Sequence, residues 1–124
     1  MPVRSAIRLG CALCLAATLA AVPAQAVVIA AVGDIMLGGR GTAVFQQQGY
    51  DYPFAATAQL LRSADVAVGN LEAPITRRGT EYQAKRFRFR TDPRTAAALK
   101  GAGFSVLTLA NNHLLDFGPE GLRD

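Results

Sequence analysis

Three apolar, β-branched runs along this chain each end in a compact polar cluster. The runs at 27–32, 66–68 and 104–110 lead into Gly33-Asp34, Gly69-Asn70-Leu71-Glu72 and Asn111-Asn112-His113. Buried strands of an α/β sheet read as such runs, and ligands bind beyond the carboxyl ends of those strands. We therefore expect carboxylate, amide and imidazole groups to converge on one site at a single edge of the sheet.

The segments between the apolar runs predict helices. Pro53 opens one whose apolar residues continue to Leu61, and Asp92-Pro93 opens another that ends at Gly101 or Gly103. Strands that alternate with helices of about ten residues are typical of βαβ units with right-handed crossovers. The predicted fold class is therefore α/β, a parallel βαβαβ sheet with helices on both faces. Its strands are predicted at about 27–32, 65–69 and 105–110, with loops at 33–41 and 71–92.

The first 26 residues have the pattern of a secretory signal peptide. Arg4 and Arg8 precede an apolar stretch at 9–21, and Ala24-Gln25-Ala26 is a cleavage signature. The stretch is shorter than the about 20 apolar residues of a membrane-spanning helix, although an uncleaved N-terminal anchor is the alternative. Both interpretations predict that residues 27–124 lie outside the cytoplasm, in the periplasm or the extracellular space, without a transmembrane span.

Cleavage would also change the chemistry available to the chain. Cys11 and Cys14 both lie in the signal, so the remainder has neither a disulfide nor a thiolate. Without Arg4 and Arg8 the positive count falls from 13 to 11 against 9 acids, a formal charge of +2. This charge is too small to predict nucleic-acid or membrane-surface binding.

The 98 residues that follow the signal are few for a parallel sheet covered by helices. Gly118-Pro119 predicts the start of a helix that reaches Asp124 before completing a turn. We therefore expect residues 27–124 to be the N-terminal part of a larger, truncated domain. A complete small protein with a frayed tail is the alternative.

The first polar cluster offers a metal ligand. Asp34 directly follows a predicted strand, and its carboxylate suits a hard cation. A helix cap or turn residue is the structural alternative. A phosphate-binding loop fits poorly, because neither glycine-rich phosphate motif is present.

The second cluster offers an amide and a carboxylate. Asn70 and Glu72 lie two residues apart in an extended segment, beside Pro74, which prevents a helix. Residues at this spacing face the same way, so both can point into one pocket. Alternatively, the Asn satisfies loop backbone groups and the Glu lies in water.

The third cluster contains the only histidine. His113 follows two asparagines at the end of a buried run, and Asp116 lies three residues further on. Imidazole binds metals, or donates a proton when a carboxylate holds its other nitrogen. A solvent-facing turn rich in Asn is the alternative.

Together these motifs resemble a known family. Residues 32–38, 69–74 and 109–113, with Asp116 and Gly118, resemble the poly-gamma-glutamate/capsule synthesis CapA family, which is similar to the calcineurin-like metallophosphoesterases. The resemblance implies a metallophosphatase-like α/β fold with a two-metal site at the strand ends. It also implies a role in making, exporting or anchoring capsular polyglutamate. Mixed oxygen and nitrogen ligands suit Mn, Fe or Zn.

The resemblance assigns roles to individual residues. The metal ligands it implies are Asp34, Asn70, Glu72 and Asn112, and the catalytic pair is His113 with Asp116. Two positions depart from the superfamily pattern, because Met36 stands in place of a histidine and Asn70 in place of an aspartate. Later histidine motifs are absent from this chain. We therefore expect the chain alone to lack a complete dinuclear site and to be inactive.

A basic segment suggests a binding surface for anions. Read as a strand, it places Arg86, Arg88 and Arg90 on one face and Phe87 and Phe89 on the other. Guanidinium groups near the metal loops would suit an anionic polymer or a phosphoester substrate. The alternative is an edge strand whose charged face is solvated.

Two classes of function follow from the sequence. One is an exported, metal-dependent hydrolase of the metallophosphatase type that acts in capsule or poly-gamma-glutamate synthesis. The other is a non-catalytic factor for polymer binding, export or anchoring that keeps the fold and a partial metal site. Met36 and Asn70 favour the second class more than a full ligand set would.

Overall fold

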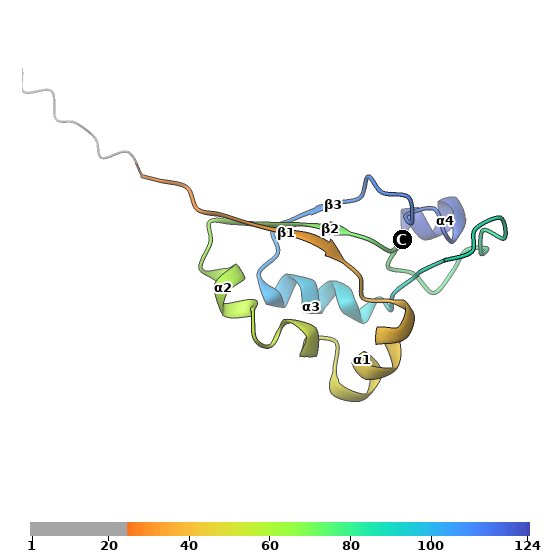
Figure 1. Cartoon of the computed structure of the whole chain (residues 1–124), viewed down its shortest axis with the longest axis horizontal. Coiled ribbons are helices and arrows are strands. Elements are labelled where there is room, and N and C mark those ends of the chain that lie inside the picture. The colour runs from red at the N-terminus through yellow and green to blue at the C-terminus, as the bar shows by residue number, and fades with distance from the viewer. Residues whose placement is uncertain (1–24) are drawn as a thin grey trace, which may run out of the picture.

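Three parallel strands form the centre of the fold. The computed structural model describes residues 25–124, so the predicted signal peptide lies almost entirely outside the described residues. Strands β1 (Ile29–Ile35), β2 (Val66–Leu71) and β3 (Val106–Thr108) form one sheet in the order β1-β2-β3. The predicted α/β class with a parallel sheet is confirmed (Figure 1).

The helices that connect the strands lie on one side of the sheet. Figure 1 shows α1 (Thr42–Gln48), α2 (Ala58–Arg62) and α3 (Arg94–Ala102) below it and α4 (Gly118–Arg123) beyond its carboxyl end. Short 3-10 turns occupy Gly39–Gly41 and Tyr52–Phe54. Two crossovers of the same hand in sequential strand order must cover the same face. Helices on both faces would need the strand order to reverse, which it does not among these three strands.

Two helical predictions need correction, and one observed helix was not predicted. Helix α1 was not predicted, because TAVFQQQ has little apolar periodicity and Phe45 alone packs against the core. The helix predicted from Pro53 is divided, since Pro53 lies in a 3-10 turn and α2 begins only at Ala58.

The last helix also differs from the prediction. Helix α4 runs from Gly118 to Arg123 and so exceeds one turn, with Pro119 at its start. The Asp124 carboxylate fixes its end by accepting hydrogen bonds from Thr76 Oγ1 at 2.6 Å and from the Arg78 guanidinium. None of the helices in residues 25–124 has the length and apolarity needed to cross a membrane.

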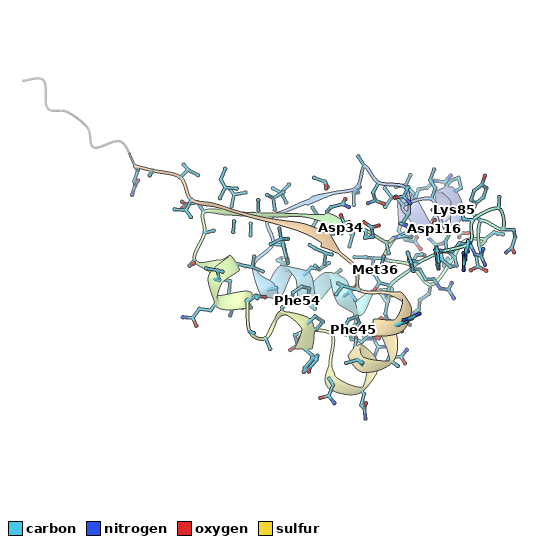
Figure 2. All side chains as sticks on the ribbon, viewed as in Figure 1. Asp34, Met36, Phe45, Phe54, Lys85 and Asp116 are labelled. Carbon is cyan, nitrogen blue, oxygen red and sulfur yellow. The ribbon has the colours of Figure 1, made fainter. Side chains whose placement is uncertain are left out.

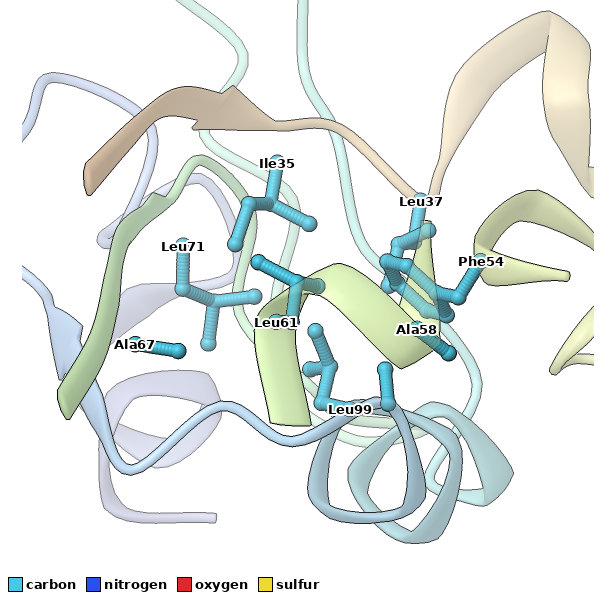
Figure 3. Close-up of a cluster of buried hydrophobic side chains, with 9 residues drawn as sticks. Ile35, Leu37, Phe54, Ala58, Leu61, Ala67, Leu71 and Leu99 are labelled. Carbon is cyan, nitrogen blue, oxygen red and sulfur yellow. The ribbon is translucent and has the colours of Figure 1, made fainter. Parts of the chain in front are cut away.

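The core lies between the sheet and its helices. It contains the buried side chains of Ile35, Leu37, Phe54, Ala58, Leu61, Ala67, Leu71, Leu99 and Ala102 (Figure 3). The opposite face of the sheet is open, with Ile29 62% and Val106 47% exposed. The apolar side chains on this face of β1 and β3 are therefore only partly covered within the described residues.

A local irregularity in β1 directs its end toward β2. The register shifts between Ala31 and Asp34, after which Asp34 pairs with Asn70. Such a bulge re-aims a side chain. Gly69 permits the close approach, because a Cβ there would lie 2.6 Å from Ile35 Cδ1 and 2.8 Å from Val32 Cγ2. The motif glycine thus allows the two polar strand ends to lie side by side.

The chain between β2 and α3 is a long loop that returns to the carboxyl edge of the sheet. The strand interpretation of 85–90 is wrong, since the only bridge recorded in this loop joins Ile75 and Thr91. The loop packs tightly on the chain after β1, where a Cβ on Gly38 would lie 2.6 Å from the Arg90 carbonyl oxygen. Alternation of Arg and Phe predicted a strand, but without a neighbouring strand the backbone forms no ladder.

Candidate functional site

The three polar clusters meet at the carboxyl ends of the strands. Asp34 at the end of β1 is in register with Asn70 of β2, and Asn70 is in register with Thr108 of β3. Glu72 follows β2 directly, and the turn that carries His113 begins just after β3. The structure therefore brings the predicted carboxylates, amide and imidazole to one rim.

The side-chain amide of Asn70 connects the three strand ends. Its Nδ2 donates to Asp34 Oδ1 at 2.8 Å and to Glu72 Oε2 at 3.1 Å. Its Oδ1 accepts hydrogen bonds from Thr108 Oγ1 at 3.1 Å and Asn111 Nδ2 at 3.1 Å. Each side of the amide thus faces partners of the matching type, which fixes its orientation.

Asn111 is a positioning residue that the sequence reasoning did not select. Its Nδ2 also donates to the Leu71 carbonyl oxygen at 2.8 Å, and its Oδ1 accepts from the His113 backbone N–H at 2.9 Å. The side chain of Asn112, in contrast, is exposed. Of the two adjacent asparagines, Asn111 is the nearer to the end of β3. This position is the one sequence feature that could have indicated its role.

His113 is held by a carboxylate on one side and faces another on its other side. The side chain is 11% exposed, with Nδ1 2.6 Å from Asp116 Oδ2 and Nε2 3.7 Å from Glu72 Oε1. A carboxylate only accepts hydrogen bonds, so Nδ1 carries the proton. Nε2 is thereby directed toward Glu72, and the Phe89 ring packs against the imidazole with centroids 4.6 Å apart.

Asp116 is fully buried and surrounded by donors. Lys85 donates to Oδ1, while Oδ2 accepts from the Phe89 backbone N–H at 2.8 Å as well as from His113. Burial alone raises the pKa of this carboxyl, but the hydrogen bonds from Lys85, His113 and Phe89 outweigh it and lower the pKa below its ordinary value. Figure 2 shows Lys85 and Asp116 together beside α4.

Lys85 is a second residue that the sequence reasoning did not place in the site. Its Nζ also donates to the Asn112 carbonyl oxygen at 2.5 Å and lies 3.4 Å from His113 Nδ1. Lys85 precedes His113 by 28 residues and lies in an irregular loop. No local pattern signals such a contact, because it depends on how the loop folds back.

The three arginines of the basic segment have different nearest partners. Arg86 lies over the Phe87 ring at 5.2 Å, and Arg90 lies over the Phe117 ring at 4.5 Å. Arg88 instead pairs with Glu81 at 2.8 Å. Of these three guanidinium groups, only that of Arg88 forms a salt bridge within residues 25–124.

The donor types present suit a divalent metal ion, but the ligands are too few and too far apart to complete its coordination. Two carboxylates and an imidazole nitrogen match the preferences of Mn, Fe or Zn. Met36, which follows β1 (Figure 2), offers only a soft thioether. Within residues 25–124 no three His, Cys, Asp or Glu side chains lie close enough together to hold an ion as they stand. Further ligands or side-chain movement would be needed.

Comparisons with known proteins are consistent with these motifs. Over 94 residues, the chain is 37% identical to the PGA biosynthesis protein CapA of Bacillus subtilis. This alignment covers 75% of this chain and 25% of the relative. Over 96 residues it is 35% identical to the capsule biosynthesis protein CapA of Bacillus anthracis, with 75% and 23% covered. A probable polyglutamine synthesis accessory protein of Mycobacterium tuberculosis is 42% identical over 62 residues, with 50% and 16% covered.

The chain spans about a quarter of the length of the first two relatives. A family model described as bacterial capsule synthesis protein PGA_cap matches residues 28–124. This match includes all three strands, the polar strand ends and the loop that carries Lys85. The chain belongs to the bacterial capsule synthesis protein PGA_cap family.

Proposed function

We propose that this chain supplies part of a divalent-metal site to an exported, metallophosphatase-like hydrolase of capsule or poly-gamma-glutamate synthesis. Family membership and the names of the Bacillus relatives support the biological role. The signal pattern of residues 1–26 supports export to the periplasm or beyond. The observation that carries the site is the placement of Asp34 and Glu72 on one amide nitrogen, with the His113 imidazole next to Glu72.

The metal would be held mainly by the carboxylates. Asp34 Oδ1 and Glu72 Oε2 each accept from Asn70, which leaves the second oxygen of each carboxylate for an ion. The two remaining proposed ligands are Asn70, whose amide would have to turn over to present its oxygen beside the carboxylates, and Asn112, whose exposed side chain is on the adjacent turn. When bound, Mn, Fe or Zn would polarise a phosphoryl or acyl oxygen.

His113 and Asp116 would perform proton transfer. Asp116 keeps a proton on His113 Nδ1 and fixes the plane of the ring. The Nε2 atom faces the carboxylates and is the atom that can exchange a proton with a reacting oxygen. Burial of the pair beneath Phe89 limits competing contact with water.

Metal titration tests the proposal. Calorimetric titration with Mn²⁺ should show binding that Asp34→Ala and Glu72→Ala each weaken by more than about tenfold, as expected for direct ligands. Asp51→Ala is the matched control, because Asp51 is an exposed aspartate in the loop between α1 and α2. Equal binding by Asp34→Ala and Asp51→Ala would contradict the proposed ligands.

One observation favours a non-catalytic alternative. Asn70 presents its amide nitrogen, a donor, to the two carboxylates, where the superfamily pattern has an acidic ligand. A factor that binds, exports or anchors the polymer could keep this hydrogen-bonded arrangement without turnover. This chain covers only about a quarter of its Bacillus relatives, so the assay that separates the two uses a protein of the relatives' full length that includes these residues, with a chromogenic phosphodiester and added Mn²⁺. Hydrolysis that is lost in His113→Ala would support the enzyme. Polymer binding with neither metal binding nor turnover would support the alternative.

A further inference from the structure

A groove beside His113 has the composition of a binding site for an anion with an apolar arm. It has a volume of about 480 Å³ and is lined by Lys85, Arg86, Phe87, Phe89, Asn112 and His113. Volumes in this range are typical of small-ligand sites. The groove lies between the His113 imidazole and loop residues 85–89, and it is shallow and widely open to solvent.

The two cationic side chains of the groove differ in whether they are already paired with a carboxylate. Lys85 is already paired with the buried Asp116 carboxylate. Arg86 is exposed, and within residues 25–124 no salt bridge to it is found. Its guanidinium is held over the Phe87 ring at 5.2 Å, a contact that leaves the edge of the fork open to a carboxylate. Arg86 is therefore the cation that a ligand can use.

The floor of the groove is aromatic. Phe87 is 59% exposed, so its ring is open to contact with a ligand, and Phe89 packs its ring on His113. Rings in this arrangement contact methylene groups well, whereas a bare inorganic anion gains nothing from them. The combination favours a carboxylate carried on a short aliphatic arm.

We infer that Arg86, Phe87 and Phe89 form a subsite for one carboxylate-bearing unit of a γ-linked glutamyl chain, next to the reacting group at His113. This inference rests on the proposed function for its substrate, but not on the metal site. It also assigns the anion to Arg86 alone. Arg88 and Arg90 do not line the groove, and Arg88 is paired with Glu81.

Binding of a fluorescent γ-linked glutamyl pentamer, measured by anisotropy without metal, tests the subsite. Arg86→Gln should weaken binding by about tenfold, the loss expected for one charge-assisted pair, and Phe87→Ala by several-fold. Arg123→Gln, an exposed arginine on α4, should bind as the unaltered chain does. A pentamer of γ-linked glutamine, which lacks the charge, should bind weakly, and inorganic phosphate should not displace the glutamyl pentamer.

Two results would overturn the subsite. One is equal affinity of Arg86→Gln and Arg123→Gln for the pentamer, and the other is equal affinity of the charged and uncharged pentamers. Absence of binding by the unaltered chain would overturn it as well. Mn²⁺ binding measured on the same Arg86→Gln protein should be unchanged. Failure of the subsite is thereby distinguished from failure of the proposed metal site.

Discussion

Asn70 Nδ2 lies within hydrogen-bonding distance of both Asp34 Oδ1, at 2.8 Å, and Glu72 Oε2, at 3.1 Å. One neutral amide thus holds two carboxylates from adjacent strand ends close together. Like charges at such separations repel, and the two N–H groups offset part of that repulsion. The amide occupies the position where a cation would bring the greatest electrostatic gain.

Asn70→Asp should therefore lower the stability of the metal-free protein and raise its affinity for metal. A third carboxylate removes the donor between Asp34 and Glu72, so the metal-free protein should lose about 1–3 kcal/mol of unfolding free energy. Mn²⁺ affinity should rise by more than about tenfold, because an acidic ligand replaces an amide. Gln47→Glu, on an exposed side chain of α1, is the control for added charge. Lower metal affinity in Asn70→Asp than in the control would be inconsistent with this geometry.

Lys85→Met should destabilise the protein. The change removes a donor from the fully buried Asp116 carboxylate and from the Asn112 carbonyl group. A buried polar group left short of a partner costs about 1–3 kcal/mol, measurable by urea unfolding. Lys100→Met is the control, since Lys100 is exposed on α3. If the two variants unfold at the same urea concentration, Lys85 has no such role.

The lowered pKa of Asp116 predicts a specific pH dependence. Because the folded-state pKa lies below the ordinary value, this carboxyl contributes stability above about pH 4, and the contribution is lost as the pH falls through the lowered pKa. The urea midpoints of the unaltered chain and Asp116→Asn should therefore differ at pH 6 and converge under strongly acidic conditions. Asp51→Asn, exposed, should track the unaltered chain at every pH. A constant difference for Asp116→Asn across this range would refute the assignment.

Gly38→Ala should disturb the contact between two loops that border the site. The added Cβ would meet the Arg90 carbonyl oxygen at 2.6 Å, and backbone cannot move aside as easily as a side chain. Overpacking of this kind costs about 1–3 kcal/mol. Gly101→Ala is the control, because nothing lies within 4 Å of its Cβ and Ala favours the helix by up to about 1 kcal/mol. Equal unfolding free energies for both variants would contradict the close approach.

The strand positions could be predicted because apolar β-branched runs carry that information locally. The runs at 27–32, 66–68 and 104–110 overlap the three observed strands, and α3 begins just after Asp92-Pro93, as predicted. Helix α1 could not be predicted in this way, since its stretch of glutamines has no apolar periodicity and it is stabilised by tertiary contact through Phe45. The pattern at 85–90 failed as a strand because no partner strand lies beside it.

The residues of the candidate site also differ in whether the sequence could predict them. Asp34, Glu72 and His113 could be selected because each lies at or after a strand end, and parallel topology places such ends together. Lys85 comes from an irregular loop, and Asn111 was passed over for its neighbour. Their roles depend on three-dimensional contacts that no local spacing encodes.

The central claim is that Asp34 and Glu72 bind an ion on the rim that they share with His113, and the single histidine of the chain makes this proximity directly measurable. Proton NMR of the His113 imidazole during titration with substoichiometric Mn²⁺ reports their proximity through paramagnetic broadening. We predict that the imidazole signals broaden first in the unaltered chain and stay sharp in Asp34→Ala. Sharp His113 signals in the unaltered chain while Mn²⁺ is bound elsewhere would contradict the account.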